Sequence, residues 1–123
     1  MIQEDKDLLL KDLCGRLPYD VKVQVFNCGV KSVETLYQID LDGYISTLEG
    51  DELKYSYKPY LFPLSSMTEE QSKIYHELIH GMFGTSVLIN LEELMNFFYK
   101  NHFDYRGLIP KGLAIDATNL NIY

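Results

Sequence analysis

The stretch from residue 21 to residue 57 limits the fold most, because it alternates apolar and polar residues and only short turns interrupt it. Alternation with a period of two is typical of strands that are buried on one face. Asp42-Gly43 is a strong tight-turn dipeptide between two of the candidate strands. Such short connections favour antiparallel pairing of successive strands, so we expect a meander of three or four strands. The candidate strands are residues 21–25, 33–39, 44–48 and 53–57.

A helix is expected before the strands, at residues 3–14. Its leucines recur near the helical period of 3.6, and its first turn is acidic, which suits the positive end of the helix dipole. Gly15 is placed to cap the end of this helix, and Pro18 prevents its continuation. Cys14 lies beside the leucines, so we expect a buried structural thiol.

A second helix is expected at residues 68–80, after a connector at residues 58–63. Two prolines fix the connector in an extended conformation, and its apolar residues suggest that it lies on the core. The helix begins with two overlapping capping boxes. They are Ser66-x-x-Glu69 and Thr68-x-x-Gln71.

A third helix is expected to begin at Asn90, which can act as its N-cap, and to stop near Asn101. Residues 86–89 form a candidate short strand before it. The order of helix, strands and helices predicts an α+β fold. It has an N-terminal helix, a three- to four-stranded antiparallel meander and two C-terminal helices, in a single globular domain over residues 1–123.

The charge balance limits the partners of the chain. Eleven basic residues stand against 18 acidic ones, which gives a formal net charge of −7, and no basic cluster occurs. Binding to nucleic acid through its phosphates is therefore not expected. The longest leucine run is too short to cross a membrane, and the first residues lack the features of a signal peptide. We expect an acidic cytoplasmic protein with no membrane partner and with free thiols at Cys14 and Cys28.

One motif suggests chemistry, because His76-Glu77-Leu78-Ile79-His80 matches the zinc-binding pattern H-E-x-x-H. Histidines four apart on a helix lie on one face and can bind one zinc ion, and Glu77 between them can act as a general base. Helical geometry turns both histidines away from the apolar face of the helix, toward solvent or a cleft. Two solvated histidines on a polar helix face explain the same pattern, and we favour that interpretation.

A zinc site would need a third protein ligand, and the sequence does not specify one. The pattern of metalloproteases with a third histidine fails, because Phe83 and Ser86 occupy its further positions. We therefore predict no metal, no cofactor and no catalytic residue, and keep zinc with His76, His80 and Glu77 as the alternative. The remaining candidates for a third ligand are Glu92, Glu93, His102, Asp104 and Asp116.

Other side chains have structural explanations. His102 follows a helix end, where a capping or packing role is expected. Asp104 and Arg106 are placed to form an ion pair. Aromatic residues cluster with lysines near residue 58, and this cluster is a candidate face for a protein partner, because tyrosine is favoured at interfaces. Its tyrosines are Tyr55, Tyr57 and Tyr60.

Three longer segments carry a resemblance to a family. They are residues 11–19 (KDLCGRLPY), 58–71 (KPYLFPLSSMTEEQ) and 101–109 (NHFDYRGLI). Together they resemble a group of small uncharacterised proteins from phages, prophages and other mobile elements of gut bacteria. The resemblance covers about a quarter of the chain and implies a bacterial or phage cytoplasmic protein of unknown function, with no site residues to carry over.

The function that these observations favour is non-enzymatic, namely a small acidic module that binds a host or phage protein. The alternative is a zinc-dependent hydrolase, a peptidase, that uses the H-E-x-x-H helix. An acidic decoy of nucleic acid ranks last, because the carboxylates are scattered among lysines. The sequence does not specify the partner or the oligomeric state.

Overall fold

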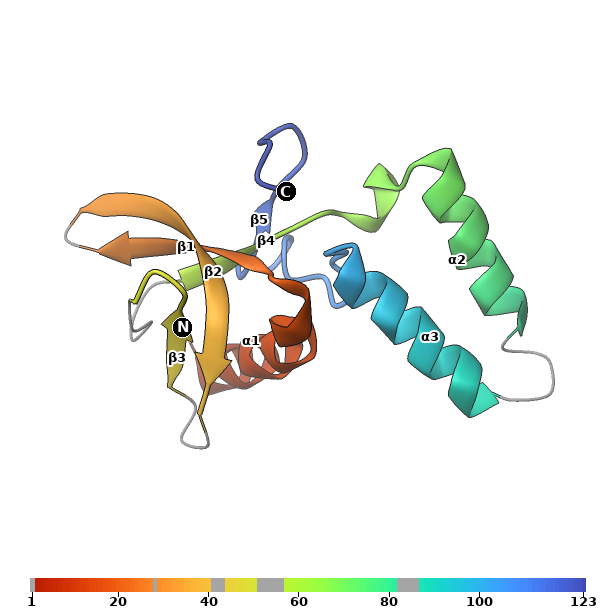
Figure 1. Cartoon of the computed structure of the whole chain (residues 1–123), viewed down its shortest axis with the longest axis horizontal. Helices are drawn as coiled ribbons and strands as arrows, with labels where there is room; N and C mark the ends of the chain where they lie inside the picture. The colour runs from red at the N-terminus through yellow and green to blue at the C-terminus, as the bar shows by residue number, and fades with distance from the viewer. Residues whose placement is uncertain (1, 28, 41–43, 51–56, 82–86) are drawn as a thin grey trace.

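The computed structural model describes residues 2–27, 29–40, 44–50, 57–81 and 87–123 (Figure 1). The fold is α+β, as predicted, with a helix, a group of strands and two later helices. Two short 3-10 turns, η1 (Leu17–Tyr19) and η2 (Leu64–Ser66), link the larger elements. These are α1 (Gln3–Arg16), β1 (Lys22–Asn27), β2 (Val30–Ile39), β3 (Ile45–Thr47), β4 (Tyr57–Leu61), α2 (Glu69–Gly81), α3 (Val87–Lys100) and β5 (Ile115–Asp116).

The strands form one sheet in the order β3-β2-β1-β4-β5. β1, β2 and β3 are consecutive antiparallel neighbours, which confirms a three-stranded meander. β4 instead returns to the other edge of β1 and pairs antiparallel with it, and β5 adds to β4 as a parallel strand. Of the fourth predicted strand only Tyr57 is described, and it begins β4; residues 53–56 and the Asp42-Gly43 turn lie outside the described residues.

β4 contains Pro59, although the sequence predicts an irregular connector at residues 58–63. Pro59 stands opposite Val23 of β1. The Leu36 amide donates to the Val21 carbonyl, which shows that alternate residues of β1, Val23 among them, bond toward β2. The nitrogen of Pro59, which carries no hydrogen, therefore points away from β1. It points to the side on which β4 begins to pair with β5 one residue later. Proline is tolerated at such a position.

α1 continues through Gly15 to Arg16, so the prediction that Gly15 caps this helix is wrong. A small residue is needed there for another reason. A Cβ atom on Gly15 would lie 2.4 Å from the Cζ atom of Tyr99 on α3. Glycine thus permits a close approach of α1 to a tyrosine ring, and the helix ends at Arg16, two residues before Pro18.

Cys14 is exposed, which contradicts the predicted buried thiol. The buried side of α1 consists of positions spaced by three and four residues, and Cys14 is not one of them. These positions are Leu9, Asp12, Leu13 and Arg16. Two of the four are charged, so the prediction from the leucine pattern of which side of the helix is buried was wrong for Cys14.

α3 begins at Val87, so the predicted strand at residues 86–89 is wrong for 87–89, while Ser86 is not described. Asn90 is the fourth residue of α3 and not its cap. A short apolar run has no periodicity of its own that separates strand from helix. Here the run joins the helix that follows it, and the predicted end near Asn101 is confirmed.

The apolar residues form two clusters. In the first, α1 packs against the inner face of the sheet, and in the second, α2 and α3 pack side by side (Figure 1). Within the described ranges, no helix has the length and apolarity needed to cross a membrane. The first cluster includes Leu9, Leu13, Val23, Val25 and Leu36, and the second is built on Leu94, Phe97, Phe98 and Phe103.

Candidate binding surfaces and side-chain clusters

The H-E-x-x-H motif lies on α2, and a capping box fixes the start of this helix. The Gln71 amide donates to Oγ1 of Thr68 at 3.1 Å, and the Thr68 amide donates to Oε1 of Gln71 at 2.9 Å. This confirms the second of the two predicted capping boxes. His76, Glu77 and His80 are all exposed, on the side of α2 that the sequence turns away from the core.

The candidates for a third zinc ligand do not gather around the two histidines. Asp104 accepts hydrogen bonds from the amides of Leu108 and Ile109, at 2.8 and 2.9 Å. Asp116 accepts from Thr118, and His102 stacks on Tyr123. In the part of the chain that the structure describes, no three His, Cys, Asp or Glu side chains are grouped closely enough to hold a metal ion.

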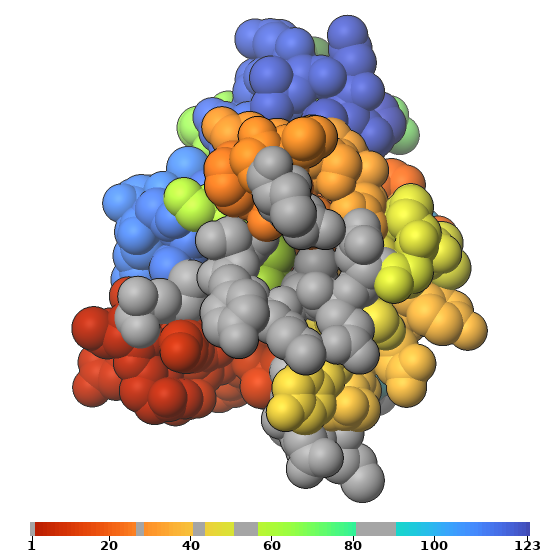
Figure 2. Space-filling view, turned by 90° about the vertical axis from the view of Figure 1, so that its left-hand side faces the viewer, coloured from red at the N-terminus to blue at the C-terminus, as the bar shows by residue number. Residues whose placement is uncertain are grey.

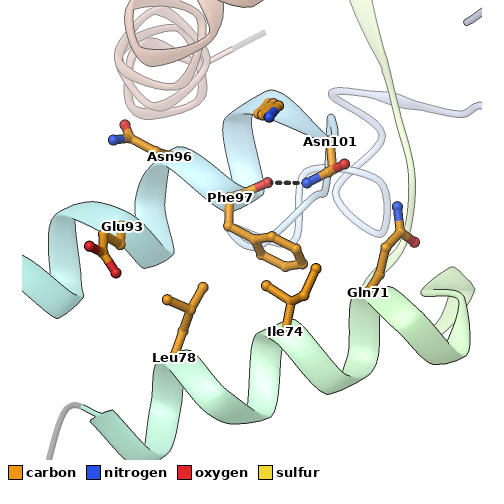
Figure 3. Close-up of a pocket in the computed structure, with 8 residues that line it drawn as sticks. Gln71, Ile74, Leu78, Glu93, Asn96, Phe97 and Asn101 are labelled. Atoms are coloured by element: carbon orange, nitrogen blue, oxygen red, sulfur yellow. Dashed lines mark hydrogen bonds between the residues drawn. The ribbon is translucent and has the colours of Figure 1, made fainter.

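A groove of about 410 Å³ lies between α2 and α3 (Figure 3). Ile74 and Leu78 line it from α2, and Phe97 lines it from α3. At about 100° per residue, His76 lies roughly 200° around α2 from Ile74 and His80 roughly 200° from Leu78, so the two histidines of the motif face away from this groove. The polar rim combines amides with one charge of each sign. It consists of Gln71, Glu93, Asn96, Lys100 and Asn101.

A buried ionic cluster centres on Asp12. Its carboxylate accepts hydrogen bonds from Nε and Nη2 of Arg16, at 2.6 and 3.1 Å, and from Nε of Arg106 at 3.1 Å. Arg16 also donates to the carbonyl oxygen of Phe103 at 2.6 Å. The predicted pair of Asp104 and Arg106 is therefore wrong. Asp104 instead caps the amides of the turn that follows it, as short acidic side chains often do.

Three segments distant in sequence meet beside this cluster. Arg16 binds the carbonyl of Phe103, while the Phe62 amide donates to the His102 carbonyl at 2.8 Å. The Phe62 carbonyl in turn accepts from the Asp104 amide at 2.8 Å. These contacts join α1, the end of β4 and the turn after α3, which are parts of the segments quoted for the resemblance. They form the junction between the two apolar clusters.

His102 packs at this junction, with a left-handed backbone of φ 60°. Its ring stacks on Tyr123 with centroids 3.8 Å apart. The pKa of His102 is lowered to about 4, chiefly by burial and also by the positive charges of Arg16 and Lys22, while Asp20 partly opposes the shift. The imidazole is neutral at pH 7 as a result, which suits a packing role.

The side of the sheet opposite α1 carries cationic and apolar side chains. Strand pairing arranges them in three rows, because directly paired residues project to the same face. The rows are Lys22 and Thr35; Lys58, Gln24 and Val33; Phe26 and Lys31. We call these seven residues the outer sheet face. It holds three lysines and no carboxylate.

Much of the outer sheet face is accessible. Phe26 is 50% exposed and Val33 is 46% exposed, and Lys31 and Lys58 are exposed as well. Figure 2 shows the β1–β2 hairpin at the surface, in orange, below the C-terminal segment in blue. α1 packs on the other face of the sheet. Apolar and basic side chains therefore adjoin each other on a surface that the described helices do not cover.

The predicted aromatic face around residue 58 is not formed as expected. Tyr60 is only 5% exposed, and Tyr57 is half-buried against the first apolar cluster. Tyr55 lies outside the described residues. Lys58 projects to the outer sheet face and is exposed. Tyr60, two residues further along β4, lies on the same side of the sheet, where Nε2 of Gln24 donates to its hydroxyl at 3.4 Å. The alternation of β1 places Phe26 on this face, but the sequence does not show the pairing of β4 with β1 that adds Lys58.

Comparisons with protein-family models, with curated proteins and with solved structures found no match. The resemblance to phage and mobile-element proteins therefore stays a prediction, and the function has to be argued from the surfaces of this chain.

Proposed function

We propose that the protein is a non-enzymatic interaction module that binds another protein through the outer sheet face. The observation that carries this proposal is the exposure of Phe26 and Val33 beside three lysines. Apolar side chains that are exposed together within a polar rim are typical of binding surfaces. The groove between α2 and α3 is less specific, because its rim combines both charges with neutral amides.

A protein suits this surface better than a nucleic acid does. Binding of single strands uses several stacked aromatic rings along a strongly basic groove. Of the seven residues of the outer sheet face one is aromatic, Phe26, and the neighbouring ring of Tyr60 is buried; the chain also has a net charge of −7. An apolar centre within a polar, solvent-accessible rim is instead the usual composition of protein interfaces that are not permanent.

Site-specific photo-crosslinking in the full chain tests the proposal. A photoreactive phenylalanine analogue replaces Phe26, or Leu91 as the matched control. Leu91 is an exposed apolar residue on α3, away from the sheet. We expect cells of the source organism to yield a discrete protein adduct from position 26, and a weaker or different one from position 91. The position-26 adduct should also disappear when Val33→Asp is added. No adduct at position 26, or an adduct that survives Val33→Asp, would refute the proposal.

Zinc-dependent hydrolysis is the alternative that the motif on α2 suggests. Zinc stoichiometry of protein purified without a histidine tag, for the wild type and for His76→Ala, tests it directly. One zinc per chain that is lost in the variant, with a peptidase activity lost in Glu77→Gln, would replace the binding proposal. No bound zinc, and no rise in melting temperature on adding zinc, would leave the motif as a solvated helix face.

A further inference from the structure

Among the described residues, no strand pairs with one edge of β2 over its first half. β3 pairs with β2 only from Leu36 onward. At Thr35 the edge is occupied, because the Leu48 amide donates to the Thr35 carbonyl and the Thr35 amide donates to Glu49. Before Thr35, no strand among the described residues pairs with this edge.

Along an antiparallel pair, alternate residues direct their N–H and C=O groups toward the partner strand, so one hydrogen bond shows which groups of β2 point out of this edge. The bond from the Leu36 amide to the Val21 carbonyl fixes Glu34, Ser32 and Val30 as the residues that bond toward β1. The N–H and C=O groups of Lys31 and Val33 therefore point away from β1. These four main-chain groups have no partner among the described residues, and unpaired edges of this kind are templates for strand addition.

The side chains beside this edge indicate which charge an added strand should carry. Lys31 and Val33 both project to the outer sheet face, where Phe26 and Gln24 pair with them. An added strand would place alternate side chains on that same face. Carboxylates there would lie beside Lys31, whereas Lys22 on β1 and Lys58 on β4 are two and three strands away from the added strand. The net negative charge of the whole chain repels an acidic strand only weakly, because salt screens charges that lie more than about 8 Å away.

We propose that an extended, acidic segment of another protein adds to the sheet as a strand along Lys31 and Val33 of β2. This inference rests on the proposed function, and it names the partner's conformation and charge. Main-chain hydrogen bonds would provide the affinity, and Lys31, the lysine of the outer sheet face that borders this edge, would provide the preference for acidic sequences.

A peptide titration followed by NMR tests this on the full chain. The probe is a short synthetic peptide that alternates Glu with Val, and the matched control alternates Lys with Val. We expect the acidic peptide to bind more tightly, more so at low salt, and to slow hydrogen exchange of the Lys31 and Val33 amides. Equal binding of both peptides, or exchange protection elsewhere, would overturn the inference.

Two variants measure separately how much the main-chain hydrogen bonds of the edge and the charge of Lys31 contribute to peptide binding. Val33→Pro removes an N–H that points out of the sheet, a position where proline is tolerated, and is expected to weaken acidic-peptide binding about tenfold. Lys31→Gln keeps the backbone and is expected to weaken it about twofold to fivefold, as for an exposed ion pair. If Val33→Pro fails to fold, Lys31→Gln still decides, since unchanged affinity in that variant would contradict the charge preference.

The outcomes distinguish this inference from the proposed function. If the position-26 adduct forms and needs Val33 but the acidic peptide does not bind, the interaction surface stands and strand addition is wrong. If the position-26 adduct fails, the surface itself is wrong. Binding of oligothymidine in place of the acidic peptide would overturn both. A concentration-dependent dimer that protects the same two amides would make the occupant a second copy of this chain and overturn the acidic-partner inference.

Discussion

The guanidinium of Arg16 and the carboxylate of Asp12 form a salt bridge of 2.6 Å in which neither side chain is exposed. Both residues lie on α1, four positions apart, so the helix alone brings them together. Arg106 reaches the same carboxylate from 94 positions later in the chain. A buried charge is costly unless it is paired and hydrogen-bonded. The two arginines at the junction of the apolar clusters therefore depend on one aspartate.

Asp12→Asn is expected to lower the free energy of unfolding by about 3–5 kcal/mol, because it leaves the charge of Arg16 buried without a counter-charge. Urea denaturation at neutral pH measures the change. Asp7→Asn is the matched control, since Asp7 is exposed on the same helix, and it should cost less than about 0.5 kcal/mol. A loss in Asp12→Asn that is no larger than in the control would show that the cluster does not support the fold.

Gly15→Ala is expected to destabilise the protein by about 1–3 kcal/mol through overpacking, although alanine is the better helix former by about 1 kcal/mol. The new Cβ would meet the ring of Tyr99. This ring cannot move freely, because its hydroxyl bonds to the hydroxyl of Tyr105 at 2.9 Å and its face lies under the guanidinium of Arg16. Thermal or urea denaturation measures the loss.

A double-mutant cycle with Tyr99→Leu isolates the clash. In that background the tyrosine ring is absent, so Gly15→Ala should become neutral or stabilising by up to about 1 kcal/mol. An equal loss in both backgrounds would mean that the close approach of α1 to Tyr99 does not explain the glycine.

Elements with local signals could be predicted from the sequence. The capping box of Thr68 and Gln71 depends on neighbouring residues only. The helices and the three-stranded meander followed from such signals. The end of α1 did not, because Gly15 is required by a tyrosine 84 positions away in the chain, and no local pattern carries that information.

The candidate site depended on pairing that is not sequential. β4 follows β3 in the chain but pairs with β1, which places Lys58 beside Gln24. The alternation that places Phe26 opposite the buried valines of β1 was visible in the sequence, whereas the neighbour of β1 on its other edge was not. The tyrosines near Lys58 therefore suggested an interface, but Tyr60 is buried in the fold.

Tyr123→Phe is expected to cost about 1–3 kcal/mol, because the lost hydroxyl bridges two backbone groups. It accepts from the Lys22 amide at 2.8 Å and donates to the Tyr60 carbonyl at 2.7 Å, where β1 and β4 would otherwise bond directly. Urea denaturation measures the cost, and faster hydrogen exchange of the Lys22 amide locates it. Tyr37→Phe, at an exposed tyrosine, is the control and should change neither value. Unchanged exchange at Lys22 would argue against the bridge.

His102 makes the stability of the protein depend on pH. Its pKa is about 4 in the folded chain against 6.5 for an ordinary histidine, with burial the largest cause. The unfolded chain therefore binds a proton that the folded chain does not, between pH 6.5 and pH 4. Stability contributed by the neutral, stacked imidazole is present above pH 6.5 and is lost as the pH falls toward 4.

The free energy of unfolding, measured by urea denaturation at several pH values from 7 to 4, should therefore fall more steeply for the wild type than for His102→Gln, whose side chain stays neutral. The difference should reach about 1–2 kcal/mol, because one pKa unit corresponds to about 1.4 kcal/mol and solvent screens a partly exposed ring. Carboxylates that titrate in this range contribute equally to both proteins and cancel. His80→Gln is the control, since His80 is exposed on α2, and it should keep the wild-type slope. If His102→Gln also keeps that slope, the junction does not hold its histidine in the neutral form.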